Sequence, residues 1–337
     1  MALLSKLLFL GLYALQATAA PRFLTPGRAP GLKLHVLHKD NTLTPSLPVD
    51  FPDPSIIQAE EGTWYAFATN TGATKVQVAR TQDPLGNNWE LLGHDAMPDA
   101  GWSSGSNTWA PDVRRVADGS YVLYFSGQVP GSHQHCIGVA RSSSVAGPYK
   151  PDPEPWVCPR AQGGAIDASG FYDEAEGKRY VAYKVDGNSR GETPTACGEG
   201  VNDPTLRTPL VLQEVADDGV RKIGQPTVMI DRVATQDGAL IEAPNLVRRG
   251  SDGMYVLFYS SHCFTDPLYD IKYAYSQNIR GPYTRSDGPL LKAPDFGLRA
   301  PGGMTSARLS GGQDFIVFHG KCQDKVRCAY SVAYDAQ

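Results

Sequence analysis

The sequence predicts an all-β fold: a five-bladed β-propeller that forms a single domain. Five stretches repeat one pattern, in which a glycine-containing turn precedes a short strand rich in aromatic residues. Successive glycines of these turns lie 57, 58, 76 and 59 residues apart. A nearly constant interval of this size is typical of folds that repeat one unit around an axis. The five glycines are Gly62, Gly119, Gly177, Gly253 and Gly312.

Length and charge limit the function classes. A chain of 337 residues is long enough for a large core and fits one all-β domain. Its formal net charge is −4, and no run of lysines and arginines occurs. We therefore expect neither nucleic acid nor an anionic membrane as a partner. We also expect a monomer.

The N-terminus is expected to be a secretory signal peptide, residues 1–20. Lys6 precedes the apolar segment Leu7–Leu15, and small residues follow at positions 17–20. The apolar run is too short to span a bilayer. We therefore expect a secreted, extracellular protein. Residues 21–48 would form an extended lead-in, with an edge strand around residues 32–37, and residues 49–337 the propeller.

Each unit is expected to contain four short strands. The first strand carries an acid, the second is the aromatic strand, and a third and fourth follow across turns rich in glycine and proline. No long amphipathic helix is predicted. The predicted third strands are residues 76–80, 136–141, 210–215, 271–275 and 328–334, and a fourth strand is predicted at residues 89–92. The longer third interval places extra residues at 187–203, where we expect a loop over one mouth of the channel.

The six cysteines predict disulfides, because the count is even in a chain expected to be secreted. Six cysteines allow fifteen pairings. Cys322 and Cys328 flank a predicted hairpin and form the preferred pair. Cys136 and Cys158 are expected to join strands of the second unit, which leaves Cys197 with Cys263.

Four acids precede the glycine turns of the first four units by seven to eleven residues: Asp53, Asp112, Asp167 and Glu242. We expect them at one equivalent position of each unit, on the strand that lines the central channel. Carboxylates that converge in a polar funnel raise one another's pKa. Such a funnel suits glycoside hydrolysis, which needs a protonated acid and an ionised base on opposite faces of a sugar ring.

The segments around these acids carry a resemblance. They are Phe51-Pro52-Asp53-Pro54, Trp109-Ala110-Pro111-Asp112, Ala165-Ile166-Asp167-Ala168 and Ile241-Glu242-Ala243-Pro244. In this order, one per unit, they resemble glycoside hydrolase family 43 from about residue 48 to residue 335. The resemblance implies an inverting five-bladed propeller enzyme that acts on arabinose- or xylose-containing plant cell-wall polysaccharides. An α-L-arabinofuranosidase or arabinanase is the first expectation.

The resemblance also implies roles for single residues. Asp53 would be the general base that deprotonates water, and Glu242 the general acid. Asp167 would modulate the pKa of the general acid and orient the substrate. Candidate substrate-binding residues are Trp109, Asp112, Arg299, His262 and Phe264. Structural alternatives remain open at this point: Asp53 as a turn cap before proline, Asp167 as an ion-pair partner, and Trp109 as a core residue.

A central cation is a further expectation from the family. Many relatives carry a Gly-Pro-Gly-His segment near the start of the fifth blade, but residues 300–305 lack that histidine. His319 is retained, and it is the candidate ligand for a Ca²⁺ ion that completes its coordination with water.

Other functions stay in view. A carbohydrate-binding propeller without catalysis would lack one of the paired acids, and both are present. A β-xylosidase specificity fits the same acids. Sucrose- and fructan-active propellers carry Asn-Asp-Pro-Asn and Arg-Asp-Pro motifs, and sialidases carry repeated Ser-x-Asp-x-Gly-x-Thr-Trp boxes, none of which occurs.

Overall fold

The computed structural model describes residues 32–72, 74–191, 197 and 203–336. The predicted signal peptide lies outside the described residues, and the predicted loop at residues 187–203 lies partly outside them. The expected domain boundaries therefore stay predictions. In the described part of the chain, no helix is long and apolar enough to cross a membrane.

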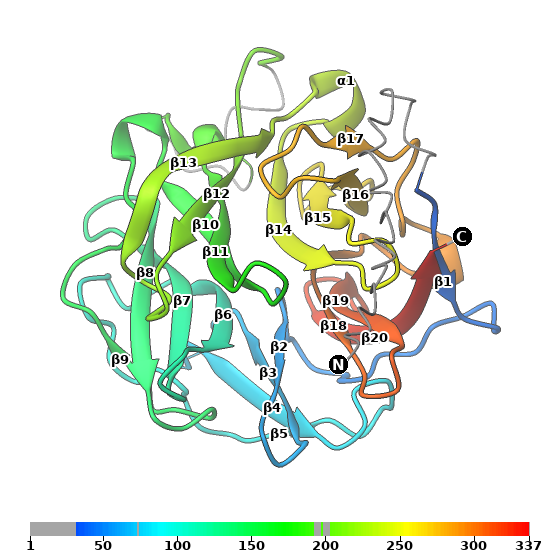
Figure 1. Ribbon diagram of the computed structural model, residues 1–337, viewed down its shortest axis with the longest axis horizontal. Helices are drawn as coiled ribbons and strands as arrows, with labels where there is room; N and C mark the ends of the chain where they lie inside the picture. Colours follow the sequence, from blue (N-terminus) through cyan, green and yellow to red (C-terminus); the bar gives the residue numbers. More distant parts are fainter. Residues whose placement is uncertain (1–31, 73, 192–196, 198–202, 337) are drawn as a thin grey trace, which may run out of the picture. The chain divides into compact units, whose positions relative to one another are not determined.

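Five four-stranded antiparallel sheets are arranged around a central axis, which confirms the five-bladed β-propeller (Figure 1). Blade 1 comprises β2 (Ser55–Gln58), β3 (Trp64–Ala68), β4 (Gln77–Thr81) and β5 (Glu90–Leu91). Blade 2 comprises β6 (Trp109–Arg115), β7 (Tyr121–Gln128), β8 (His135–Ser142) and β9 (Lys150–Pro151). Blade 3 comprises β10 (Ala165–Asp173), β11 (Lys178–Val185), β12 (Leu210–Val215) and β13 (Lys222–Ile230).

The last two blades follow the same order. Blade 4 comprises β14 (Ile241–Arg248), β15 (Tyr255–Ser261), β16 (Asp270–Ser276) and β17 (Thr284–Arg285). Blade 5 comprises β18 (Gly302–Arg308), β19 (Asp314–Lys321), β20 (Arg327–Ala336) and β1 (Leu34–Leu37). Short helical turns are η1 (Arg160–Gln162), η2 (Gly187–Ser189), α1 (Ala234–Asp237) and η4 (Asp295–Gly297).

Strand β1 closes the ring. It pairs antiparallel with β20, so that Leu34 lies opposite Ala336 and Leu37 opposite Ala333. The fifth sheet thus takes its outer strand from the N-terminal lead-in and its other three strands from the C-terminal part of the chain. The edge strand expected around residues 32–37 is confirmed.

The aromatic strands pack the blades against one another. Phe67 of blade 1 shares a buried cluster with Leu123 and Phe125 of blade 2, and all three side chains are fully buried. Equivalent clusters join the other blades. Burying a large apolar side chain contributes about 1.5–3 kcal/mol, so the repeated aromatic pattern accounts for the contacts between blades.

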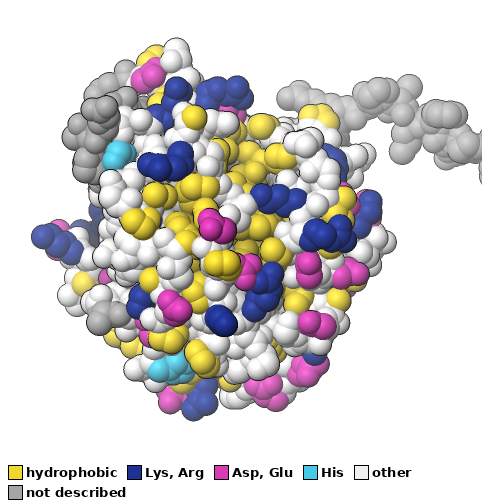
Figure 2. Space-filling view, turned by 90° about the vertical axis from the view of Figure 1, so that its left-hand side faces the viewer, with side chains coloured by type: hydrophobic (Ala, Val, Ile, Leu, Met, Phe, Trp, Pro, Cys, Tyr) yellow, Lys and Arg dark blue, Asp and Glu magenta, His cyan; other side chains and the backbone are white. Residues whose placement is uncertain are grey.

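The outer surface mixes charges of both signs. On the face seen in Figure 2, lysine and arginine side chains are interspersed with aspartate and glutamate. Arg141 of β8, for example, forms an ion pair with Asp152, which follows β9.

A bulge recurs at the channel end of the innermost strands. In blades 2 to 5 the pairing between the first two strands shifts at this point. One residue of each segment has positive φ there: Ala110, Asp167, Ala243 and Gly303, with Asp53 at the corresponding place just before β2. Extra residues of this kind turn side chains away from the sheet's regular alternation. The bulges therefore decide which side chains enter the channel.

The bulges correct one prediction. The four acids do not share one equivalent position. Asp53 and Asp167 are the positive-φ residues of their blades, Glu242 comes one residue before its bulge residue, and Asp112 comes two residues after Ala110. Spacing from the aromatic strand could not resolve these one- and two-residue offsets, yet in a strand they determine the direction of a side chain.

The three expected disulfides are present: Cys136–Cys158, Cys197–Cys263 and Cys322–Cys328. The first lies within blade 2 and the third within blade 5. The second joins the connection between β11 and β12 to the residues after β15, and so links blades 3 and 4.

Candidate active site

A cavity of about 390 Å³ lies where the innermost strands meet, and residues of all five blades line it. Its volume is in the range of ordinary ligand pockets. Asp53, Asp167 and Glu242 all line it. The structure therefore brings the three predicted catalytic carboxylates into one cavity.

Asp53 is held by hydrogen bonds from blade 1 and contacts from blade 5. Its Oδ2 accepts a 2.6 Å hydrogen bond from the Thr69 hydroxyl, and Arg327 Nη1 lies 3.5 Å from its Oδ1. Burial alone would raise the pKa of this carboxyl. The Arg327 guanidinium, together with His319 and the Thr69 hydroxyl beside the carboxylate, outweighs burial and lowers the pKa of Asp53. Asp53 is therefore ionised at neutral pH.

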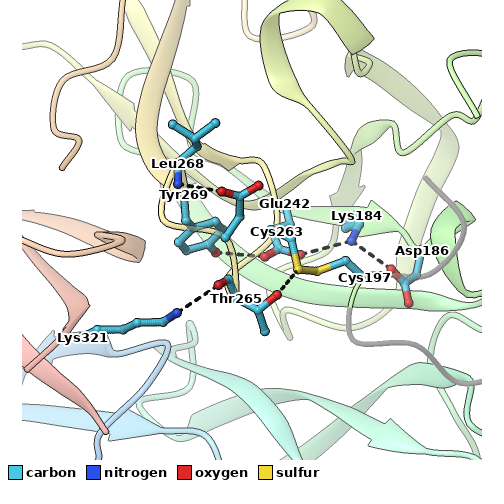
Figure 3. Close-up of a disulfide and its surroundings, with 10 residues drawn as sticks. Lys184, Asp186, Cys197, Glu242, Cys263, Thr265, Leu268, Tyr269 and Lys321 are labelled. Atoms are coloured by element: carbon cyan, nitrogen blue, oxygen red, sulfur yellow. Dashed lines mark hydrogen bonds and ion pairs between the residues drawn. A yellow bond between two sulfur atoms is a disulfide. The ribbon is translucent and has the colours of Figure 1, made fainter. Parts of the chain in front are cut away.

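Glu242 lies between a lysine and a tyrosine (Figure 3). Lys184 Nζ is 3.2 Å from its Oε2, and the Tyr269 hydroxyl donates a 2.9 Å hydrogen bond to its Oε1. The Glu242 side chain is 13% exposed. Both carboxyl oxygens are thus held in place, and the group still faces the cavity.

Asp167 lies beside Glu242. Its Oδ2 accepts a 2.9 Å hydrogen bond from the Ala243 amide, directly after Glu242 in the chain. Burial raises the pKa of Asp167 well above its ordinary value, and the negative charge of Glu242 adds to the effect. Of these two neighbouring carboxyl groups, Asp167 is therefore the one whose ionised form its surroundings disfavour.

Glycines of blade 5 provide space for these groups. A side chain on Gly302 would collide with the Tyr269 ring, 1.9 Å from the place of its Cβ. A side chain on Gly303 would lie 2.8 Å from Asp53 Oδ1. At these two positions blade 5 therefore leaves room for the Tyr269 ring and the Asp53 carboxylate.

The Asp112 carboxylate is buried and bonded within the protein. It is 3% exposed, its carboxylate forms an ion pair with Arg114, 2.7 Å between Nη2 and Oδ1, and its Oδ2 accepts a 2.8 Å hydrogen bond from Gly170 N of blade 3. Asn245 of blade 4 makes the equivalent bond with Ser306 N of blade 5. Asp112 borders the cavity, but its oxygens connect neighbouring blades.

The predicted substrate-binding residues divide into two groups. Trp109 and Phe264 line the cavity, and Trp109 stacks on His135 with ring centroids 3.6 Å apart. Arg299 and His262 are not among the residues that line it, and their role in substrate binding stays a prediction. Arg299 is exposed.

A different arginine lies beside Asp53, and His262 has other contacts. The arginine beside Asp53 is Arg327 at the start of β20, stacked over the Phe264 ring at 5.0 Å. The His262 ring instead packs against Gly238 and contacts the Ser261 hydroxyl.

The surroundings of His319 do not fit a directly bound cation. Its Nδ1 accepts a 3.0 Å hydrogen bond from the Asp53 amide, and burial lowers its pKa, so the neutral ring carries its proton on Nε2. Nε2 has no partner among the described residues and would act as a donor, for example to water. No group of three or more His, Cys, Asp or Glu side chains in the described ranges could hold a metal ion. His319 as a calcium ligand stays an expectation from the family, and no step below is routed through a cation.

Three functional side chains were not predicted: Arg327, Tyr269 and Lys184. Lys184 is the most conspicuous, because it is fully buried and lies 2.9 Å from Asp186 and 3.2 Å from Glu242. A lysine inside the apolar segment Tyr180–Val185 was a visible signal, since lysines are almost never fully buried without a partner. Arg327 and Tyr269 give no comparable signal in the sequence.

Comparisons with known proteins agree with this geometry. The model of the family "Glycosyl hydrolases family 43" matches residues 42–331. A probable arabinan endo-1,5-alpha-L-arabinosidase C of Aspergillus flavus is 30% identical over 124 residues, 36% of either chain. A beta-xylosidase of Bacillus subtilis is 26% identical over 254 residues, 71% of this chain and 42% of the relative. The alignments thus span well under half the length of these curated relatives.

A solved structure shares the fold. A thermostable family-43 glycoside hydrolase superimposes with a TM-score of 0.71 at 24% identity, over 88% of this chain and 92% of that one.

Proposed function

The chain belongs to glycosyl hydrolase family 43, and we propose that it is an inverting glycoside hydrolase for arabinose- or xylose-containing polysaccharides. The observation that carries the proposal is the pair Asp53 and Glu242, which line one cavity in opposite electrostatic surroundings. Asp53 is held ionised by Arg327. Glu242 lies beside Asp167, a buried carboxyl group whose pKa is raised well above its ordinary value.

Asp53 is the proposed general base. It accepts a proton from a water molecule as that water attacks the anomeric carbon from the face opposite the leaving group. Its lowered pKa keeps it available as an acceptor over the whole neutral range. The Thr69 hydroxyl fixes Oδ2, so we assign the accepting role to Oδ1.

Glu242 is the proposed general acid. It gives its proton to the glycosidic oxygen as the bond to the anomeric carbon breaks, and a single displacement inverts the configuration. Asp167 supports this role, because its raised pKa keeps a proton on this pair of neighbouring carboxyl groups, and an acid catalyst needs a proton to deliver.

The proposed substrate class rests on the relatives and on the wall of the cavity. The relatives named above are an arabinan endo-1,5-alpha-L-arabinosidase and a beta-xylosidase. Trp109 and Phe264 offer aromatic faces for the apolar side of a sugar ring. We place arabinofuranosidase or arabinanase activity first and β-xylosidase specificity second. We further propose secretion as a monomer, since three disulfides suit an oxidising compartment.

The test is hydrolysis of nitrophenyl pentosides, arabinan and xylan by wild type, Asp53→Asn and Glu242→Gln. We expect Asp53→Asn to lose about 10²–10⁴-fold in kcat/KM on every substrate. Glu242→Gln should lose as much on polysaccharide but less on nitrophenyl pentosides, because nitrophenolate leaves with little need for a proton. Proton NMR of the first product should show the inverted anomer.

Asp173→Asn is the matched control. Asp173 lies on the same strand as Asp167 and is fully buried, but it bonds to the Tyr255 hydroxyl and does not line the cavity. This variant should keep wild-type turnover. Full activity in both Asp53→Asn and Glu242→Gln would rule out the proposed mechanism. Sugar binding by a wild type without turnover would favour the carbohydrate-binding alternative.

A further inference from the structure

Lys184 lies at a position where, in the other blades, the side chain accepts a hydrogen bond from a backbone amide of the next blade. The equivalent residues, each opposite the start of the bulge, are Thr69, Ser126, Ser260 and His319. Each accepts a hydrogen bond from the amide of the positive-φ residue in the next blade, at 2.9–3.0 Å. A lysine ammonium has no acceptor and cannot do this.

In blade 3, Asp167 takes over the role of acceptor that the lysine cannot fill. The Ala243 amide of blade 4 donates to Asp167 Oδ2 instead of to Lys184. Lys184 Nζ is thereby released from the backbone and lies between two carboxylates, 2.9 Å from Asp186 Oδ1 and 3.2 Å from Glu242 Oε2. The exchange places both Asp167 and a buried cation beside the same catalytic carboxyl.

The lysine is firmly charged. Burial alone would lower the pKa of Lys184, but the carboxylates of Asp186, Glu242 and Asp167 together raise it. Asp186 is 2% exposed, and the two residues form a buried ion pair. Removing one member of such a pair leaves the other charge uncompensated.

We propose that Lys184 is a positioning residue for the acid catalyst: its ammonium group holds Glu242 Oε2, so that Oε1 carries the transferable proton. This inference deepens the proposed function and rests on it. As the proton passes from Oε1 to the glycosidic oxygen and the C–O bond breaks, Glu242 becomes an anion. Lys184 stabilises that anion at the moment it forms.

The charged groups around Glu242 act in opposite directions. Lys184 from β11 places a positive charge 3.2 Å from Glu242 Oε2, and Asp167 from β10 is a second carboxyl group beside Glu242. Asp53 of blade 1 adds negative charge within electrostatic range of Asp167. The Tyr269 hydroxyl bonds to Oε1, and His319 of β19, whose pKa is lowered by burial, is neutral. Lys184 is the cation in direct contact with Glu242 among the described residues.

The experiment is the pH profile of Lys184→Met with aryl pentosides of graded leaving-group pKa. Loss of the cation should move the alkaline limb of kcat/KM to higher pH, because the Glu242 anion that forms on proton transfer no longer has a counterion. The value of kcat/KM falls on the alkaline side where the acid catalyst loses its proton, so a more weakly acidic catalyst shifts this limb to higher pH. Turnover of poor leaving groups should fall at least tenfold more than turnover of nitrophenyl pentosides. Lys184→Arg keeps the charge and should keep the limb within a few tenths of a unit.

Two further variants separate this role from stability. Lys184→Met/Asp186→Asn removes both buried charges and should fold if the single variant does not, yet its alkaline limb should still move. Lys272→Met removes a mostly buried lysine from the partners Asp237 and Asp270, away from the cavity. It should lower the melting temperature and leave the limb in place.

Contrary outcomes are distinct for the two proposals. A folded Lys184→Met enzyme with the alkaline limb and the leaving-group dependence of the wild type would overturn the positioning role of Lys184. If Glu242→Gln is defective in the same experiment, the proposed hydrolase function still stands. Carbon-13 NMR titration of the Glu242 carboxyl, in wild type and Lys184→Met, gives an answer without turnover. Equal titration midpoints would overturn the inference even if no pentoside is hydrolysed.

Discussion

At the scale of single residues, two carboxyl groups of one chemical type are tuned in opposite directions. Asp53 and Asp167 both occupy positive-φ bulge positions facing the channel. Asp53 meets a guanidinium and a hydroxyl, and its pKa falls below the ordinary value. Asp167 meets another carboxylate and little solvent, and its pKa rises. The neighbours, and not the residue type, thus separate a base from a modulator.

This contrast predicts opposite effects on stability. A raised pKa in the folded state means that ionised Asp167 destabilises the fold, with the penalty growing as pH rises from about 3.8 through the folded value. Asp167→Asn cannot ionise and can still accept the Ala243 amide. It should therefore melt about 2–4 °C above wild type at pH 7–8, and the difference should vanish below pH 3.8. Thermal melts between pH 3 and pH 8 measure it.

For Asp53→Asn we expect a change in melting temperature of the opposite sign. The lowered pKa of Asp53 means that its ionised form stabilises the fold above about pH 3.8, and that this contribution is lost as pH falls through the folded value. Asp53→Asn should therefore melt below wild type at neutral pH. If both variants shifted the melting temperature in the same direction, the two environments would not differ as described.

The sequence could predict the carboxylates but not their partners. Asp53, Asp167 and Glu242 follow a repeated pattern, so a position in one blade points to the next. Arg327 contacts Asp53 across 274 residues of sequence, and no local pattern encodes such a contact. Arg299 was chosen because it directly precedes residues 300–305, whereas the arginine that lies beside Asp53 is Arg327.

At the scale of strands, glycine turns and aromatic periodicity predicted the blades well because they are local signals. All five predicted third strands appear in the structure, as β4, β8, β12, β16 and β20. The bulges were not predictable, since inserting one extra residue leaves the periodicity of a short strand almost unchanged. The bulges nevertheless determine that Asp112 bonds to the next blade while Asp167 faces the cavity.

Ring closure by β1 gives a prediction at this scale. Leu34 is 8% exposed, packs in the cluster shared by blades 4 and 5, and donates a hydrogen bond from its amide to the Tyr273 hydroxyl oxygen. Leu34→Ala should therefore lower the free energy of unfolding by about 2–4 kcal/mol. Leu37, on the same strand, is 48% exposed, and Leu37→Ala should change it by no more than about 0.5 kcal/mol. Urea denaturation measures both, and equal effects would show that β1 does not secure the ring.

At the scale of the whole molecule, the disulfides differ in what they connect. Cys136–Cys158 and Cys322–Cys328 each close a loop inside one blade, whereas Cys197–Cys263 ties blade 3 to blade 4 across 66 residues of sequence. Cys263 also precedes Phe264, which lines the cavity under Arg327. This one disulfide thus cross-links two blades and also anchors the chain next to Phe264 in the cavity wall.

The last prediction compares two of these bonds. Loop-closure entropy gives about 4 kcal/mol for the bond across 66 residues and about 2 kcal/mol for Cys322–Cys328 across 6 residues. Cys197→Ser/Cys263→Ser should therefore lower the melting temperature more than Cys322→Ser/Cys328→Ser. It should also raise KM, because Phe264 and the Arg327 side chain stacked on it lose their support, while kcat changes less. Calorimetry and steady-state kinetics test both expectations. A larger loss of stability from the Cys322 and Cys328 pair would mean that the contacts between blades, and not the cross-link, hold blades 3 and 4 together.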